Sequence, residues 1–565
     1  MNKHMKRYIS LAALLLVGCV ATAQVKVDGS VYGGGNLAEV DGSTTVTVNQ
    51  GGASVENDVY GGGALADVGT LGTTSHIVFM LNGTVKGAVY GGGLGDGDHA
   101  AKVNGEVTVN IGTSLDNGNA TLSGASVFGG NNANGSPQDD VTVHIWKTAH
   151  TTDDDVDGSD FAIANVFGGG NEAGYVPATA LKKCLVYVHG CENTIGRSFG
   201  GGNAADVGTA DAQGTVTLRT DVETIIEGGR LGQVFGGGNG EVTAANINGN
   251  LSLEIHGGDV GQFYGASNER GTISGDISVD VDSEGACGEL TINELFSGSN
   301  LAPITGNLTT NINCSTTGDL TINNLYGGCN QANISGGDVV LNVYGGHYIN
   351  VYGGSCGTPT SGADIQGNVT LNLYGGTIEN AFGGSNVKGN ITGTITVNVL
   401  DEEGSCPLYV TNIYGGSNMA DYIPTFTPAS GSERISPVVN VVHAKYGISG
   451  NVYGGSKGVE GATGEDETIV KETSPLVNIG YDADMNGSLP SAYVDFISDE
   501  NGLSNNTRVI IGGSVYGGGD AAKVQQGNTA IYLRNRAKVF GNVYGGGNMG
   551  EVDGNTKVIV NGVVQ

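Results

Sequence analysis

The chain has 565 residues, of which 102 are glycine and only 10 are proline, and it has no Gly-X-Y period, which excludes a collagen-like triple helix. Hydrophobic residues make up 38% of the composition and recur in short alternating runs, which argues against an intrinsically disordered chain. The formal net charge of −32, from 56 acidic and 24 basic residues, repels phosphate backbones and anionic headgroups, so nucleic acid is not an expected partner.

Residues 1–23 have the pattern of a secretory signal peptide. Three basic residues within the first seven positions precede a short apolar run, and "ATA" at 21–23 offers a small-residue cleavage site. The segment "LVGC" also resembles a lipobox, which would make Cys19 the acylated first residue of a lipoprotein. Both alternatives predict export, to the extracellular space or the outer-membrane surface. No later apolar run is long enough to span a bilayer.

From residue 25 onward, an aromatic residue followed by glycines recurs along the chain, as in "VYGGGN", "VFGGGN" and "AFGGSN". These aromatic residues, called anchors below, lie 26 to 39 residues apart, with one interval of 63. The sixteen anchors are Tyr32, Tyr60, Tyr90, Phe128, Phe167, Phe199, Phe235, Tyr264, Phe296, Tyr326, Tyr352, Phe382, Tyr414, Tyr453, Tyr516 and Tyr544. Such a period is typical of a solenoid that grows by stacking copies.

Each copy contains three extended pieces separated by turns. In residues 31–60, Val46 and Val48 alternate with threonine, and this period-two alternation predicts half-buried strands. Glycine and asparagine in the turns supply positive φ at low steric cost. No copy has a helical apolar pattern long enough for a helical crossover. The sequence therefore predicts an all-β fold: a parallel β-helix, or β-solenoid, of about sixteen coils over residues 24–565, with three short strands per coil.

Asparagine follows the anchor by four residues in eleven copies. These are Asn36, Asn132, Asn171, Asn203, Asn239, Asn268, Asn300, Asn330, Asn386, Asn418 and Asn548. Equivalent positions stack in a β-helix, so we expect these side chains to form a structural ladder of hydrogen bonds along the axis.

Two segments interrupt the repeat and are predicted to be loop insertions. The first, near 421–437, contains "DYIPTFTPASGSERISP" and should protrude from the solenoid. The second, near 457–510, accounts for the 63-residue interval and is acidic and partly apolar. Insertions in solenoids map to loops that often carry the binding face.

The repetition of "GGxIxN" and "GG[SN]" motifs over most of residues 25–565 resembles the right-handed parallel β-helix surface and secreted proteins of Gram-negative bacteria, in particular those with adhesin-type repeats. Proteins of this kind include adhesins, passenger domains and polysaccharide lyases or hydrolases. The resemblance therefore implies the fold and an exported location, but the fold alone does not choose the function.

No catalytic constellation recurs in the chain. It has "VHGC" and "IHGG" but neither the "GHG" nor the "RIK"-like segments of galacturonan hydrolases, so no catalytic residue is predicted. The stretch "GGGLGDGDH" is the best metal candidate, because Asp96 and Asp98 with backbone carbonyls could hold calcium; a solvated turn is the alternative. No other cofactor is expected.

Seven cysteines follow the signal segment, so at least one stays unpaired. Cys329 and Cys356 occupy adjacent offsets in neighbouring copies, and stacked turns could bring them within disulfide distance. Cys184 and Cys191 flank "LVYVHG" and could form a local bridge. Separate reduced cysteines are the alternative for both pairs.

Tyrosine anchors are the sharpest ligand candidates, because a row of exposed rings could stack on sugars. Nine of the ten tyrosine anchors are the candidates: Tyr32, Tyr60, Tyr90, Tyr326, Tyr352, Tyr414, Tyr453, Tyr516 and Tyr544. The alternative is that the rings pack within the fold, which the phenylalanine anchors favour.

The preferred interpretation is a non-catalytic exported β-solenoid that acts as a surface adhesin or scaffold, with a glycan or a host or cell-surface protein as partner. A polysaccharide lyase or glycoside hydrolase on the same fold is one alternative, and a passive cell-envelope module is another. Residues 31–49 and 543–561 are nearly identical, which predicts either a truncated longer protein or end-to-end stacking of molecules.

Overall fold

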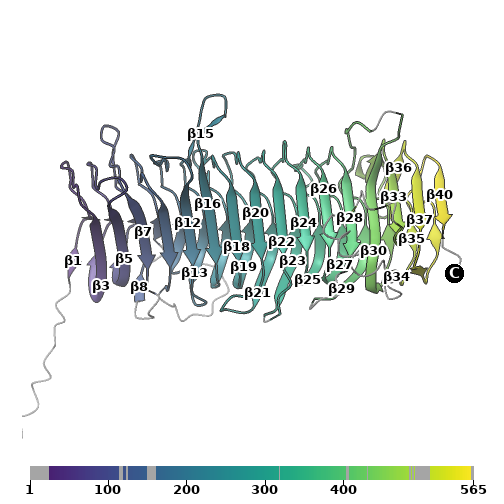
Figure 1. Cartoon of the computed structure of the whole chain (residues 1–565), viewed down its shortest axis with the longest axis horizontal. Helices are drawn as coiled ribbons and strands as arrows, with labels where there is room; N and C mark the ends of the chain where they lie inside the picture. The colour runs from purple at the N-terminus through teal and green to yellow at the C-terminus, as the bar shows by residue number, and fades with distance from the viewer. Residues whose placement is uncertain are drawn as a thin grey trace, which may run out of the picture.

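The computed structural model describes residues 25–113, 119–122, 125–148, 161–316, 318–401, 406–428, 431–482, 485, 489 and 509–561. These residues form an all-β, solenoid-like rod in which the strands lie side by side along one long axis, from β1 at one end to β40 at the other (Figure 1). The short 3-10 turn η1 (Gly464–Asp466) lies near the C-terminal end. The predicted signal segment 1–23, with Cys19, lies outside the described residues.

The longer strands of each repeat pair in parallel with those of the neighbouring repeats and form one long sheet, called sheet A. Its strands are β1 (Lys26–Val27), β3 (Thr44–Val55), β5 (Ser75–Val85), β7 (Glu106–Ile111), β8 (Asn119–Thr121), β10 (Val141–Ile145), β12 (Lys182–Val188), β16 (Thr220–Ile226), β18 (Leu251–Ile255), β20 (Ile277–Val281), β22 (Leu308–Ile312), β24 (Val339–Val343), β26 (Val369–Leu373), β28 (Ile395–Leu400), β30 (Ile435–Ile448), β33 (Ser474–Ile479), β37 (Thr529–Leu533) and β40 (Thr556–Val560).

A second long parallel sheet, sheet B, carries the anchors. Its strands are β2 (Val31–Tyr32), β4 (Val59–Tyr60), β6 (Val89–Tyr90), β9 (Ser126–Phe128), β11 (Ile163–Phe167), β13 (Thr194–Phe199), β17 (Arg230–Phe235), β19 (Gly258–Tyr264), β21 (Leu290–Phe296), β23 (Leu320–Tyr326), β25 (His347–Tyr352), β27 (Gly376–Phe382), β29 (Leu408–Tyr414), β31 (Val452–Tyr453), β34 (Val509–Ile511), β35 (Val515–Tyr516), β38 (Ala537–Val539) and β39 (Val543–Tyr544). Every anchor is the last residue of its strand, and the anchors of neighbouring repeats are paired in register.

The third extended piece of most repeats is a single bridging residue, which differs from the predicted third strand. Ile247, Ile273 and Ile304, for example, form successive isolated parallel bridges. Only β32 (Ile469–Lys471) and β36 (Lys523–Gln525) lengthen this side into paired strands within the described residues. The polar turn residues on both sides leave room for one inward apolar side chain, so this side closes the core without a continuous sheet.

Inward side chains from all three sides form one narrow core along the axis. In β10 the alternating Val141, Val143 and Ile145 are buried, while the residues between them are partly exposed. Because Val143 pairs with Val109 on one side and Val186 on the other, each inward residue stacks on its equivalents in both neighbours. The apolar face of one repeat is thus buried by the next, which ties the stability of each repeat to its neighbours.

The chain turns directly after each anchor, and glycine is needed there. At Gly200, which follows the anchor Phe199, an added Cβ would overlap the carbonyl oxygen of Gly236 and would lie 2.7 Å from a methyl group of Val222. Successive turns therefore pack backbone against backbone, which accounts for the "GG" after the aromatic residue.

Several segments leave the rod. The antiparallel pair β14 (Thr209–Ala210) and β15 (Val216–Leu218) forms a hairpin that projects from one edge (Figure 1). In the first predicted insertion, Tyr422 forms an isolated bridge with Val470, the described residues from 423 to 434 contain no strand, and β30 begins at Ile435. The second insertion is not entirely loop, because β33 within it pairs with β30 and β37 and continues sheet A; much of 483–508 lies outside the described residues.

Candidate functional site

The anchor rings form one uninterrupted column along the rod. Neighbouring rings lie 4.7 to 5.1 Å apart between centroids, with interplanar angles of 1° to 11°, from Tyr32 to Tyr544. This separation equals the spacing of hydrogen-bonded strands, so sheet B sets the stacking distance. Each interior ring has both faces covered by other rings.

This packing decides between the two interpretations of the tyrosine anchors. Tyr60, Tyr90, Tyr326, Tyr352, Tyr414 and Tyr453 are buried, Tyr32 and Tyr516 are partly buried, and Tyr544 is exposed. Burial raises the pKa of Tyr264 and of Tyr453 to about 12. The interior rings cannot offer a face to a sugar, so the expected row of sugar-stacking tyrosines is not present in the column.

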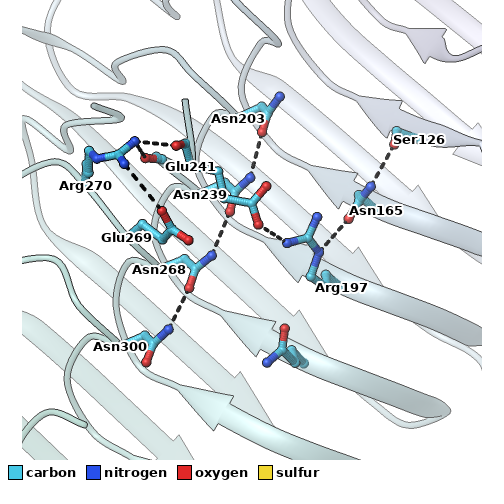
Figure 2. A network of polar contacts seen from close by, with 12 residues as sticks. Ser126, Asn165, Arg197, Asn203, Asn239, Glu241, Asn268, Glu269, Arg270 and Asn300 are labelled. Carbon is cyan, nitrogen blue, oxygen red and sulfur yellow. Dashed lines mark hydrogen bonds and ion pairs between the residues drawn. The ribbon is translucent and has the colours of Figure 1, made fainter. Parts of the chain in front are cut away.

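The asparagines four residues after the anchors are hydrogen-bonded side chain to side chain. In Figure 2 the amides of Asn203, Asn239, Asn268 and Asn300 form a continuous chain along the axis, with N–O distances of 2.8 to 2.9 Å. The chain runs from Asn132 to Asn330 through further bonds of the same kind. Each amide inside this chain donates to one neighbouring asparagine and accepts from the other, which satisfies polar groups beside a crowded turn.

Where the preceding repeat lacks the ladder asparagine, a tyrosine hydroxyl accepts the hydrogen bond in its place. Leu94 stands in the ladder position before Asn132, and Asn132 donates instead to the hydroxyl of Tyr60 at 2.8 Å. Cys356 likewise stands before Asn386, which donates to the hydroxyl of Tyr326 at 3.1 Å. Asn418 continues the ladder from Asn386, whereas Asn548 donates to Asp520 and Asn36 is exposed at the N-terminal end.

A second polar row on the outer face of sheet B is linked to this ladder. Asn165 donates to Ser126 and accepts from Arg197, whose guanidinium also forms an ion pair with Glu241, two residues after Asn239 (Figure 2). Further along the sheet, Asn324, Asn350, Asn380 and Asn412 form an amide row of the same kind. These rows satisfy polar groups and bind neighbouring repeats together.

The stretch predicted as a calcium site forms a turn held by hydrogen bonds to Asp96. The Asp96 carboxylate accepts hydrogen bonds from the backbone N–H groups of Asp98 and His99 and from the His99 ring. These bonds, the one from Asp98 first, hold the pKa of Asp96 below its ordinary value. Within the described residues there is no cluster of three side chains suited to a metal ion.

The cysteines pair differently from either predicted pair. Disulfides join Cys191 to Cys287 and Cys314 to Cys406, while Cys184, Cys329 and Cys356 are free.

The alternation of side chains explains why the predicted partners do not meet. Cys184 points into the core from β12 and donates to the Gly200 carbonyl, whereas Cys191 lies in the following turn. Cys329 follows its anchor by three residues and is buried, with its amide bonded to Ser355. Cys356 follows its anchor by four residues and takes a place in the asparagine row, so the two thiols belong to different rows.

Both disulfides lie at the corners that connect a sheet A strand to the next sheet B strand. Cys191 follows β12 and Cys287 follows β20, and β16 and β18 lie between these strands in the sheet. The strands are on the order of 14 Å apart, yet the two Cα atoms are 5.4 Å apart. The cysteine turns therefore lean across the two corners between them, and we call each such bridge a clasp.

Glycines at the intermediate corners make room for the clasps. An added Cβ at Gly228 would overlap the Cys287 sulfur, and one at Gly257 would lie 3.1 Å from Cys287 Cβ. The second clasp repeats the arrangement, because an added Cβ at Gly345 would lie 3.1 Å from the Cys406 sulfur. Together the clasps secure the consecutive repeats from β12 to β29.

The outer face of sheet B contains an open hollow of about 350 Å³, which we call the tyrosine groove. It is lined by His347, Ile349, Thr377, Glu379, Tyr409 and Tyr446, with other residues of β23, β25, β27, β29 and β30. The rings of Tyr409 and Tyr446 form one end, 5.1 Å apart and tilted by 36°. Their exposed fractions are 44% and 51%, and that of Ile349 is 48%.

This groove was not predicted from the sequence, because its two tyrosines lie outside the repeated anchor motif. Tyr409 lies five residues before the anchor Tyr414, in "LYVTNIY", at an outward position of the alternating strand. Paired repeats have Thr377 and His347 at that position. An aromatic residue at an outward position was therefore the available signal.

Comparisons with protein-family models, curated proteins and solved structures gave no match to this chain. Among the described residues, no helix combines the length and the apolar character that a membrane crossing requires.

Proposed function

We propose that the protein is an exported, non-catalytic β-solenoid of about sixteen coils that acts as a surface adhesin or scaffold. The observation that carries this proposal is the unbroken column of anchor rings, which couples every repeat to the next from Tyr32 to Tyr544. At the strand spacing such a column gives a rod on the order of 75 Å long. A rod of this kind holds surface groups at fixed intervals, which suits display and attachment.

Two further features support an exported scaffold. Disulfides persist in oxidising compartments outside the cytoplasm, and both clasps bridge long stretches of chain. The N-terminal signal pattern agrees with export. The acidic surface keeps such a rod soluble and directs it away from anionic lipids and nucleic acids.

Attachment and turnover assays test this proposal together. Beads coated with the purified full-length chain should bind to epithelial or bacterial cell surfaces more than beads coated with the reduced, unfolded chain do. Incubation with a panel of plant and bacterial polysaccharides should release neither reducing ends nor unsaturated products. Turnover abolished by one Asp→Ala change would overturn the non-catalytic proposal. Failure of the beads to bind any surface would leave a passive cell-envelope module as the better description.

A further inference from the structure

We propose that the tyrosine groove binds a neutral oligosaccharide, with the rings of Tyr409 and Tyr446 as the surface on which a pyranose ring stacks. This inference deepens the proposed adhesin function and rests on it. It assigns the ligand contact to the outer face of sheet B, and the anchor column has no part in it.

The shape of the groove follows from one large side chain in a row of smaller ones. Tyr409 on β29 is in register with Thr377 on β27, which is in register with His347 on β25. The ring of Tyr409 therefore rises above the neighbouring repeats as a step. Tyr446 extends this step, because β30 pairs with β29 here only between Ile448 and Val410 and Gly447 turns with φ +84°. The result is a floor of short side chains that ends at two rings.

The two rings present surface that the fold does not use. Within the described residues, the hydroxyls of Tyr409 and Tyr446 make no hydrogen bond to the protein, and both side chains are about half exposed. Together with Ile349, which also lines the groove, they give it exposed apolar surface among polar groups, and such surfaces mark binding sites more often than isolated exposed residues do. The electron-rich face of an aromatic ring attracts the partly positive C–H bonds of a pyranose.

Polar side chains along the floor supply partners for sugar hydroxyls. The imidazole of His347, the hydroxyl of Thr377 and the carboxylate of Glu379 are exposed and have no hydrogen-bond partner in the described part of the chain. Hydroxyl groups both donate and accept, so a ligand rich in hydroxyls can satisfy all three. A few placed polar groups beside an apolar wall are typical of small-molecule sites.

The charges of the groove select a neutral glycan over an acidic one. None of its lining residues, all of which are described, is lysine or arginine, and Glu379 places a negative charge on the floor. Lys445 stands outside the lining, with its ammonium 5.9 Å from the centroid of the Tyr446 ring. In a chain of net charge −32, a uronate or sialylated ligand would meet repulsion along this floor.

The repeat spacing also fits a chain of sugars. Successive strands of sheet B are separated by the 4.8 Å seen between the anchor rings Phe382 and Tyr414. This step is close to the advance per residue of an extended β-linked glycan. A segment of three or four pyranose units could therefore meet equivalent side chains on β23, β25, β27 and β29.

The test screens the purified full-length chain against an array of neutral and acidic glycans and then titrates the strongest neutral binder by calorimetry. The double variant Tyr409→Ala/Tyr446→Ala should weaken this binding at least tenfold, about 1.4 kcal/mol. Tyr409→Phe should retain it, because the stacking face remains. Thr377→Trp should abolish it by filling the floor. Phe540→Ala, which removes an aromatic residue that is 65% exposed elsewhere, should leave it unchanged.

Three outcomes would overturn the assignment: no neutral glycan binds, the double variant binds as tightly as the parent, or an acidic glycan binds as tightly as its neutral counterpart. If coated beads still attach to cells in any of these cases, the adhesin function stands and only the groove assignment fails. If neither glycans nor cells are bound, both proposals fail. Circular dichroism of each variant confirms that lost binding does not reflect unfolding.

Discussion

The central repeats, from β12 to β29, and the repeats at the two ends of the described chain share one sequence motif but differ in how completely it is packed. In the centre, Phe199 and Phe235 are fully buried, Asn239 is enclosed in its ladder, and both clasps are present. At the ends, Tyr32 is only partly buried and Tyr544 is 44% exposed. The same residues therefore contribute more where a neighbour covers each side, as expected for a nearly one-dimensional array.

The largest expected difference is in the ring column. Phe235→Ala should lower the free energy of unfolding by about 4 kcal/mol, because it leaves a cavity between two stacked rings. Tyr544→Ala at the C-terminal end should cost about 1 kcal/mol, because its side chain is already half in water. Urea denaturation followed by circular dichroism measures both values. Equal losses at the two positions would contradict the comparison.

Removing a clasp should lower the stability of the central repeats and so reduce their difference from the repeats at the ends. The double variant Cys191→Ser/Cys287→Ser should lose about 3 kcal/mol, since the loop that the disulfide closes is long. Thermal melting with and without reductant measures the loss, and the parent should become less stable when reductant is added.

Cys356→Ser is the matched control for the clasp, because this thiol is free, and its melting should respond to reductant as the parent does. Gly228→Val adds a second test, since a side chain there collides with the Cys287 sulfur. That variant should show two more titratable thiols than the parent. An unchanged thiol count would disprove the geometry of the clasp.

A smaller effect is expected in the amide ladder. Asn239→Ala should destabilise the fold by about 2 kcal/mol, because Asn203 and Asn268 each lose a partner beside a crowded turn. Asn36→Ala, at an exposed position, should change stability by less than about 0.5 kcal/mol. Parallel denaturation curves give the comparison, and similar losses for the two variants would count against a structural role for the ladder.

The smallest expected effect on stability concerns the phenol groups of the column, and it appears only at alkaline pH. Burial raises the pKa of Tyr264 and Tyr453 to about 12, against about 10 in an unfolded chain. The folded state therefore binds more protons than the unfolded state between these values. Their contribution to stability is complete below about pH 10 and is lost as the pH rises towards 12. Denaturation midpoints measured from pH 8 to 12 should show this decline, and a rising midpoint would contradict it.

Much of the architecture could be predicted because it repeats. The anchor residues, the glycines and the asparagines recur in register, and a parallel stack places equivalent residues side by side. Phe128, Phe167 and Phe199 at anchor positions already favoured packed rings over exposed ones. The predicted third strand is mostly a single bridging residue, because one apolar side chain between polar turns is enough to close the core.

The clasps and the groove could not be predicted because each depends on a departure from the repeat. The pairing of Cys191 with Cys287 requires that the two corners between them have no side chain where the cysteine turns cross, and Gly228 and Gly257 meet this requirement. The spacing of the cysteines in the sequence does not indicate which corners are free of side chains. The groove depends on Tyr409 rising beside smaller neighbours and on Tyr446 arriving from a strand with an irregular register. Individual departures of this kind shape the groove that we propose as a ligand site, which the average repeat does not show.

The backbone contacts at the anchor turns have a consequence for how such a protein can change in length. Because the turn at Gly200 fits against the turn at Gly236 in the way that most other pairs fit, whole repeats can be removed or added without altering the joint between those that remain. Within the clasps this freedom ends, since a lost or added repeat would change the number of strand steps across which Cys191 meets Cys287 and Cys314 meets Cys406. The number of repeats is therefore constrained between β12 and β29, and most of the groove, from β23 to β29, lies in this constrained part.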